Sequence, residues 1–331
     1  MAKKKRLGEF ALIRRYFAPL AAGAPGALGL TDDAALIRAR KGRELVVTTD
    51  ALVAGVHFPM NETPDSVAQR ALGVNLSDLA AMGAKPLVYT LAIALPKRCD
   101  AGWVGRFAAG LGRVQKAHGI HLIGGDTVAT KGPLTISITA IGDVGRGTAL
   151  RRGGAKAGDA IYVSGTIGDA ALGLKAVKGG LRGLSARQRK ALIDRYRRPR
   201  PRVRLGLALV GLARAAIDVS DGLAADLGHI AETSGLAAEI DAARVPLSAA
   251  ARAALAHDPK LMPLVLGGGD DYEIAFTAPP GAAARVATLA RRLKLPLTRI
   301  GRMKKGKIGT VRINDRQGRA LRVDSGGYQH F

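Results

Sequence analysis

The chain has 331 residues, which is long enough for two domains that each bury a core. Its hydrophobic share of 47% excludes an intrinsically disordered protein, and its single cysteine excludes an internal disulfide and favours a reducing, cytoplasmic location. The net charge of +25 would suit a nucleic-acid-binding protein, which we keep as an alternative. Because the basic residues are spread along the chain, aromatic residues make up only 4% and no nucleic-acid-binding motif occurs, we favour a solvated basic surface and expect no nucleic-acid partner.

Apolar residues recur at helix and strand spacing along both halves of the chain. In the first half we expect helix 7–20, strand 45–49, helix 66–82, strand 87–95, helix 101–118, and strands 120–123 and 134–144. A glycine-rich basic connection over 145–158 leads to strand 160–164, helix 167–178, strand 215–219, helix 222–233, strand 272–277, helix 281–293 and a hairpin over 314–318. This alternation predicts an α/β or α+β protein of two domains, residues 1–148 and 149–331. The longest apolar runs are about half the length of a membrane span, so no membrane association is expected.

The acidic residues carry most of the functional information. Twenty of the 26 are Asp, which suits loops, caps and metal ligands better than helix surfaces. Five segments share one pattern, an apolar strand or turn followed by Asp with Gly, Ser or Thr beside it: Thr31–Asp33, Thr48–Asp50, Asn75–Asp78, Gly124–Thr127 and Asp218–Gly222. Each alone is ordinary turn chemistry, but together they predict oxygen ligands that converge on several Mg²⁺ ions between two anionic reactants. The segments contain no His or Cys, which argues against zinc.

The pair Gly124-Gly125 would let backbone N–H groups approach a phosphate closely, although a tight turn after a strand explains it equally well. The chain contains no P-loop motif. It also lacks the His-Arg-Asp and Asp-Phe-Gly motifs of protein kinases. Any nucleotide site therefore belongs to neither of these two classes.

The order of these segments resembles the thiamine-monophosphate kinase family, part of the aminoimidazole-ribonucleotide synthetase superfamily. The resemblance is carried by Gly8–Phe10, Thr31–Ala34, Thr49–Phe58, Val74–Ala84, Leu122–Thr127, Ile217–Leu223 and Gly326–Tyr328. It implies the two-domain fold of that superfamily, with an N-terminal α+β domain (1–148) that binds ATP and Mg²⁺ and forms a homodimer. A C-terminal α/β domain (149–331) would complete the nucleotide and substrate site. The implied enzyme is a cytoplasmic kinase of thiamine biosynthesis that converts thiamine monophosphate to thiamine diphosphate with ATP.

The resemblance also implies roles for individual residues. Several Mg²⁺ ions would be held by Asp33, Thr48, Thr49, Asp50, Asp78, Asp126, Asp218 and Asp221. ATP would be contacted by Gly125, Asp126, Arg152 and Ser220, and thiamine monophosphate by His57, Asp270 and Tyr328. Taken from the residues alone, His57 and Tyr328 could equally be structural, and Arg151 could take the place of Arg152.

The sequence departs from the family pattern at two positions. The family usually has Gly-Gly-Glu-Asp where this chain has Gly268-Gly269-Asp270-Asp271, so the side chain of Asp270 is one methylene shorter and its substrate contact would be shifted or water-bridged. An aromatic residue that often lies near the nucleotide in the family is matched here by Ala108 or Ala109.

We expect in-line transfer without a general base, because a phosphate monoester is already mostly dianionic near neutral pH. Catalysis would then depend on positioning and on metal charge. The same-fold alternative is a cyclase like aminoimidazole-ribonucleotide synthetase, which would use ATP and release inorganic phosphate.

Overall fold

The computed structural model describes residues 8–323, which fold into two compact units. The first unit is Met1–Leu79 with Ala84–Gly147, and the second is Ala80–Gly83 with Thr148–Phe331. Helices and strands occur in both units, which confirms the predicted α+β and α/β class. Within residues 8–323, none of the helices has the length and apolar character needed to cross a bilayer. The roles assigned to the two predicted domains stay predictions.

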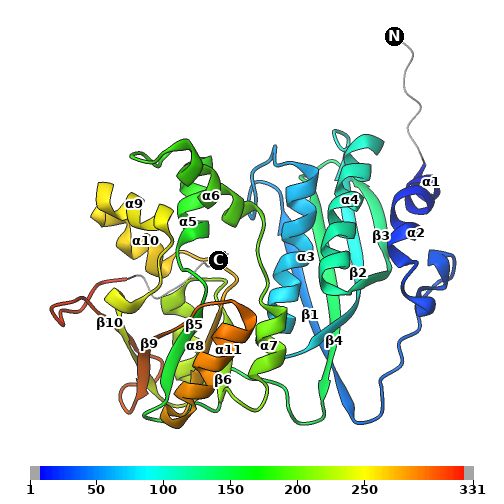
Figure 1. Cartoon of the computed structure of the whole chain (residues 1–331). Helices are drawn as coiled ribbons and strands as arrows, with labels where there is room; N and C mark the ends of the chain where they lie inside the picture. Colours follow the sequence, from blue (N-terminus) through cyan, green and yellow to red (C-terminus); the bar gives the residue numbers. More distant parts are fainter. Residues whose placement is uncertain (1–7, 324–331) are drawn as a thin grey trace. The chain divides into compact units, whose positions relative to one another are not determined.

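The first unit is a four-stranded sheet with helices on one face. The strands are β1 (Arg43–Val53), β2 (Lys85–Pro96), β3 (His121–Thr130) and β4 (Thr135–Gly145), in the order β1-β4-β2-β3. β4 is antiparallel to β1 and β2, whereas β2 and β3 are parallel. Helices α3 (Pro64–Ala81) and α4 (Ala101–His118) lie side by side over the sheet, with Gly110 against Ala68 (Figure 1). β1 and β3 are therefore the two edges of the sheet.

Two strands of this unit run farther than the sequence predicts. The predicted strand 120–123 ends before Gly124, but β3 continues to Thr130 because it pairs with β2 along its length. Gly125 makes this possible, since a Cβ at that position would lie 1.9 Å from the carbonyl oxygen of Leu91. β1 likewise continues past Thr49 to Val53. Asp50 and Asp126 thus lie within strands and do not follow strand ends.

The predicted helix over 7–20 is a short helical run composed of α1 (Glu9–Leu12), the π-turn η1 (Ile13–Phe17) and α2 (Ala18–Ala21). Only its second half packs firmly, because Phe10 is 76% exposed and Phe17 is 3% exposed. The 3-10 segment η2 (Pro25–Leu30) follows and contacts β3. This run and η2 form one wall of a cavity beside β3.

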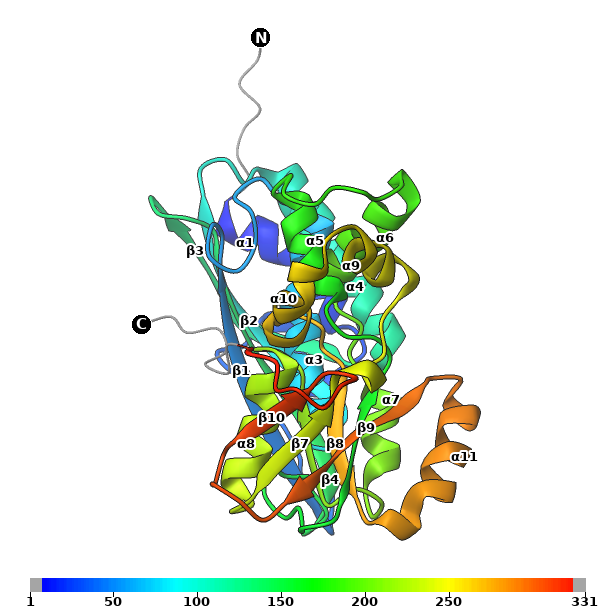
Figure 2. The ribbon, with the colours of Figure 1, turned by 90° about the vertical axis from the view of Figure 1, so that its left-hand side faces the viewer.

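The second unit contains a six-stranded sheet in the order β10-β7-β9-β5-β8-β6. The strands are β5 (Ala160–Ser164), β6 (Ala215–Asp218), β7 (Ala237–Asp241), β8 (Ile274–Ala278), β9 (Leu297–Lys304) and β10 (Val311–Asn314). The helices are α5 (Asp169–Val177), α6 (Ala186–Arg197), α7 (Val203–Leu209), α8 (Leu223–Thr233), α9 (Ala249–His257), α10 (Met262–Gly267) and α11 (Ala283–Leu293). Figure 2 shows α8 and α11 on opposite sides of this sheet. The apolar face of α8 packs on the sheet through Leu223, Leu227 and Ile230, which are fully buried.

The C-terminal part of the second unit differs from the expected pattern. The sequence analysis does not identify β7, β9, α9 or α10. The predicted hairpin around 314–318 is present, because Asn314 and Ala320 form an antiparallel bridge and Asp315 N donates to Arg319 O (2.8 Å). The strand before the turn, β10, pairs in parallel with β7.

Candidate active site

The predicted metal ligands on β1 and α3 form a first group, which we call the β1 group (Thr48, Asp50 and Asp78). The hydroxyl of Thr48 donates a hydrogen bond to Asp78 Oδ2 at 2.5 Å, so the Thr48 side chain faces α3. Asp50 follows two residues later and points to the same face. Thr49 points to the opposite face, where its hydroxyl lies 2.7 Å from that of Thr139. The β1 group is therefore on the helix side of the sheet, and Thr49 is not part of it.

The β1 group concentrates negative charge in a partly buried place. Burial, and secondarily the nearby carboxylate of Asp78, raises the pKa of Asp50 to about 6. Two carboxylates and a hydroxyl are hard oxygen donors of the kind that Mg²⁺ prefers, and a divalent cation would relieve their repulsion. Within residues 8–323, however, no three or more His, Cys, Asp or Glu side chains are arranged to hold a metal ion. The β1 group fits part of a magnesium site and needs further ligands.

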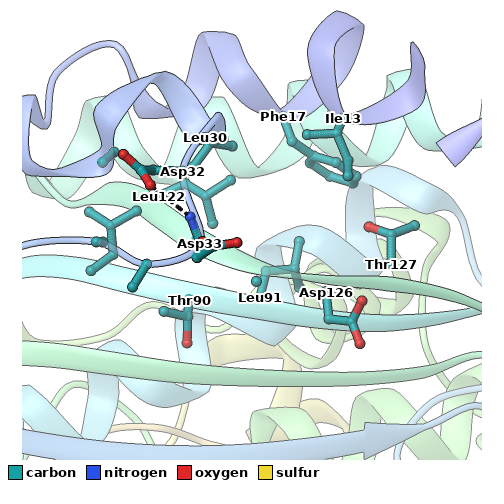
Figure 3. Close-up of a pocket in the computed structure, with 16 residues that line it drawn as sticks. Ile13, Phe17, Leu30, Asp32, Asp33, Thr90, Leu91, Leu122, Asp126 and Thr127 are labelled. Atoms are coloured by element: carbon teal, nitrogen blue, oxygen red, sulfur yellow. Dashed lines mark hydrogen bonds between the residues drawn. The ribbon is translucent and has the colours of Figure 1, made fainter. Parts of the chain in front are cut away.

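A second group lines a cavity at the other edge of the sheet, which we call the β3 cavity. Its volume is about 360 Å³, within the usual range for a small-molecule site. Asp33 and Asp126 lie on its polar side, and Ile13 and Phe17 lie on its apolar side (Figure 3). Gly125 also lines the cavity. The cavity therefore offers backbone and carboxylate groups opposite an apolar wall.

The β1 group and the β3 cavity lie far apart within one chain. Asp50 pairs with Ile138, Ile138 pairs with Leu91, and Leu91 pairs with Gly125. Three strand spacings of about 4.8 Å place the backbones of Asp50 and Gly125 about 14 Å apart. Asp126 also points away from the helices, because its partner Ala92 is exposed between buried neighbours. The expectation of one shared pocket is therefore not met within the first unit.

In the second unit, two loops bring four predicted residues together. Asp218 is the last residue of β6, and the loop that follows contains Ser220 and Asp221. The other contains Asp270, whose backbone N–H donates to Ser220 O at 2.8 Å. Gly269 permits this contact, since a Cβ there would lie 1.9 Å from Ser220 O. Of the predicted residues of this unit, one nucleotide residue (Ser220), two metal residues (Asp218 and Asp221) and one substrate residue (Asp270) thus lie on adjoining segments.

A buried carboxylate that the sequence analysis did not single out supports the first of these loops. Asp226 is 1% exposed, and its Oδ2 accepts hydrogen bonds from the backbone N–H groups of Asp221 (3.2 Å) and Gly222 (3.1 Å). Burial, followed by the nearby carboxylates of Asp218 and Asp221, raises the pKa of Asp226 well above its usual value. One feature of the sequence pointed to Asp226, which is an acidic residue in the first turn of α8. This helix begins directly after the pair Asp221-Gly222.

Two more buried acids support the second loop. Both carboxylate oxygens of Asp271 accept backbone N–H groups at the start of α5, from Gly168 (2.6 Å) and Ala170 (3.1 Å), and burial raises its pKa to about 8. Glu273 is fully buried and is bonded to the guanidinium groups of Arg195 and Arg202. These contacts join residues roughly 70 to 100 positions apart, which explains why no local sequence pattern revealed them.

Three other predicted residues have no clear place among these groups. His57 follows β1, and its Nδ1 accepts the backbone N–H of Val53 at 2.9 Å, a contact that shapes the turn. Arg152 is exposed, and the carbonyl of the preceding Arg151 accepts the N–H of Ala216 in β6. Tyr328 lies outside the described residues. Their predicted ligand contacts stay predictions.

Comparison with known proteins identifies the family. Residues 31–144 match the N-terminal domain, and residues 156–314 the C-terminal domain, of AIR synthase related proteins. The thiamine-monophosphate kinase of Escherichia coli (strain K12) is 42% identical over 325 residues, which cover 98% of each chain. The chain belongs to the thiamine-monophosphate kinase family. The predicted family is therefore confirmed.

Solved structures in the thiamine-monophosphate kinase family share the fold. The crystal structure of the kinase from Stenotrophomonas maltophilia K279a has a TM-score of 0.84 and 46% identity, and the match covers 96% of this chain and 99% of that one. The structure of AaThiL complexed with AMPPCP and TMP has a TM-score of 0.76 and 29% identity, with full coverage of both chains. The predicted two-domain fold is confirmed.

Proposed function

We propose that this protein is a thiamine-monophosphate kinase, which transfers the terminal phosphoryl group of ATP to thiamine monophosphate. The observation that carries this proposal is the nearly full-length identity of 42% to the Escherichia coli kinase. The AaThiL structure supports it further, because it is complexed with AMPPCP and TMP and covers the whole of this chain. A cytoplasmic location agrees with a biosynthetic enzyme that has one cysteine.

The proposed ATP contacts are Gly125, Asp126, Arg152 and Ser220. In the first unit, Gly125 and Asp126 line the β3 cavity, whose apolar wall suits a flat heterocycle and whose polar side suits phosphates. In the second unit, Ser220 and Arg152 are the proposed ATP contacts. Thiamine monophosphate would be contacted by Asp270, His57 and Tyr328.

The proposed magnesium ligands are Asp33, Thr48, Thr49, Asp50, Asp78, Asp126, Asp218 and Asp221. The raised pKa of Asp50 supports a cation at the β1 group, because two neighbouring carboxylates are present there. When bound, the ions supply positive charge that offsets the repulsion between the two phosphate-bearing substrates. The chain's carboxylates and backbone N–H groups orient the reactants.

A homodimer would complete the site. The sheet face opposite α3 and α4 exposes apolar side chains at both edges, Leu45 (39%) and Val47 (60%) on β1 and Val128 (48%) on β3, which would suit an interface. A two-fold axis along the strands would place the β1 edge of one copy against the β3 edge of the other. Asp126 of a second copy would then approach the β1 edge, whereas within one chain Asp126 lies at the opposite edge of the sheet.

The proposed reaction needs no general base. A phosphate oxygen of thiamine monophosphate forms a bond to the γ-phosphorus of ATP, and the bond from that phosphorus to the β,γ-bridging oxygen breaks, so ADP leaves. The attacking phosphate is largely dianionic at neutral pH because its second pKa is about 6. The protein contributes alignment and a prearranged electrostatic environment.

The activity is tested by incubating the protein with ATP and Mg²⁺ and, in separate reactions, thiamine monophosphate, thiamine or the amidine precursor of aminoimidazole ribonucleotide. Mass spectrometry should detect thiamine diphosphate and ADP in equal amounts with thiamine monophosphate only. Release of inorganic phosphate with the amidine would instead support the cyclase. No turnover, combined with steeply salt-dependent binding of nucleic acid, would support the nucleic-acid-binding alternative.

The shared site is tested by mixing two inactive variants, Asp50→Asn and Asp126→Asn. In a mixed dimer, one of the two sites would combine the intact Asp50 of one copy with the intact Asp126 of the other. An equal mixture should therefore recover about a quarter of wild-type activity, since half of the dimers are mixed and half of their sites are intact. Activity no higher than that of either variant alone would contradict a site shared between copies.

A further inference from the structure

The hydroxyl of Tyr272 contacts the carboxylate that we assign to the substrate. It donates a hydrogen bond to Asp270 Oδ1 at 3.1 Å, across a single intervening residue. The tyrosine is only 9% exposed, so its ring is held by the surrounding protein. A fixed donor therefore sets the position of one oxygen of Asp270.

The backbone around this contact is unusual in a way that brings the two side chains together. Asp270 and Tyr272 both have positive φ, 71° and 52°, a conformation that residues other than glycine rarely adopt. Their backbone N–H groups donate to Ser220 O and Val219 O, both at 2.8 Å. Strained conformations of this kind persist only where the surrounding structure holds them, and they concentrate at functional sites.

Asp271, which lies between them, holds the loop from the other side. Its carboxylate accepts hydrogen bonds from two backbone N–H groups at the start of α5, those of Gly168 and Ala170, and its carbonyl accepts one from Arg195 at 3.1 Å. Asp271 therefore points into the unit, whereas the side chains of Asp270 and Tyr272 meet each other. The loop is fixed on both sides, and the Asp270–Tyr272 contact is part of a rigid arrangement.

We infer that Tyr272 is a positioning residue for the binding of thiamine monophosphate, acting through its hydrogen bond to Asp270. The inference rests on the proposed function. A carboxylate is suited to the cationic ring or the amino group of that substrate, and an oxygen already held by a donor loses less entropy when the substrate binds.

The test is Tyr272→Phe, which keeps the ring and removes the hydroxyl. The KM for thiamine monophosphate should rise about tenfold, the scale for a lost hydrogen bond to a charged group. The KM for ATP and kcat should stay within about twofold, because the phosphoryl-transfer groups are untouched. Tyr162→Phe is the matched control, since Tyr162 is also buried (5% exposed) in the second unit but stacks on Phe276; it should change neither KM.

The Asp270→Ala background, which removes the acceptor of the hydrogen bond, separates positioning from a general loss of structure. If Tyr272 acts through the carboxylate, Tyr272→Phe should add less than about twofold to the KM of the Asp270→Ala variant. A further tenfold rise in that background, or an equal rise in the KM for ATP and for thiamine monophosphate, would overturn the inference.

A crystal structure of Tyr272→Phe distinguishes this inference from the proposed function. A displaced Asp270 carboxylate would support the positioning role, and an unchanged carboxylate would overturn it, whether or not the enzyme turns over. The proposed function fails separately, if the wild-type protein forms no thiamine diphosphate.

Discussion

Replacing Asp50 by Asn should make the metal-free protein more stable while it removes activity. Burial and the neighbouring Asp78 raise the pKa of Asp50 from 3.8 to about 6, so the ionised carboxylate destabilises the folded state. The pKa of Asp50 is higher in the folded state than in the unfolded state. The free energy of unfolding is therefore greatest below pH 4, where Asp50 is protonated, and falls as the pH rises through about 6. Asn carries no charge and escapes this loss.

The size of this stabilisation follows from the shift in the pKa of Asp50. At 1.36 kcal/mol for each pH unit, the rise from 3.8 to about 6 corresponds to about 3 kcal/mol at pH 8. Because Asn must still be desolvated, we expect a gain in the free energy of unfolding of about 1–3 kcal/mol. Below pH 4 the gain should nearly vanish, because Asp50 is then protonated in the folded state.

Urea unfolding in EDTA, followed by tryptophan fluorescence, measures this gain. Trp103 is the single tryptophan of the chain and lies in α4, so its signal reports on the unit that contains Asp50. Asp126→Asn, which changes an exposed carboxylate of the same unit, is the control and should leave the midpoint unchanged at both pH values. An Asp50→Asn variant no more stable than wild type at pH 8, or equally stabilised at pH 4 and pH 8, would refute the reasoning.

Two further predictions concern the same unit. The Mg²⁺ affinity, measured by calorimetry, should fall as the pH drops below about 6, because protonated Asp50 is a poor ligand. The fall should reach up to about tenfold for each pH unit. An affinity that is unchanged between pH 7.5 and pH 5 would contradict this prediction. Gly125→Ala should lower the free energy of unfolding by about 1–3 kcal/mol, because its Cβ would lie 1.9 Å from Leu91 O. Gly124→Ala is the control in the same fluorescence assay, since the nearest neighbour of its added Cβ would be 3.9 Å away. An equal loss of stability in both variants would show that the Leu91 contact is not the cause.

Elements with strong local signals could be predicted from the sequence. Helix α4 begins and ends where expected, because Asp100 caps its first turn through Trp103 N (2.7 Å) and Gly119 ends it with a left-handed φ of 65°. β5 also has the expected limits, because its five residues are all buried and the first four form one apolar run. Both features depend on side chains close together in the sequence.

The remaining features depend on contacts between distant segments. The glycine pair suggested a turn, but pairing with β2 keeps β3 extended through Gly125. The sequence motifs predicted which residues belong to the candidate site. They did not predict that these residues separate into a β1 group and a β3 cavity, which follows from the strand order β1-β4-β2-β3. Asp226 and Asp271 were not chosen as site residues because each supports a loop from a buried position, and the burial of an acidic side chain does not follow from its neighbours in the sequence.

The strand order of the first unit also bears on how catalysis would respond to dilution. If each site takes carboxylates from the β1 edge of one copy and the β3 edge of another, a lone chain would remain folded and yet hold only part of each site. Specific activity would then fall with protein concentration well before any loss of secondary structure. The affinity between copies would set the lowest concentration at which the cell could use the enzyme.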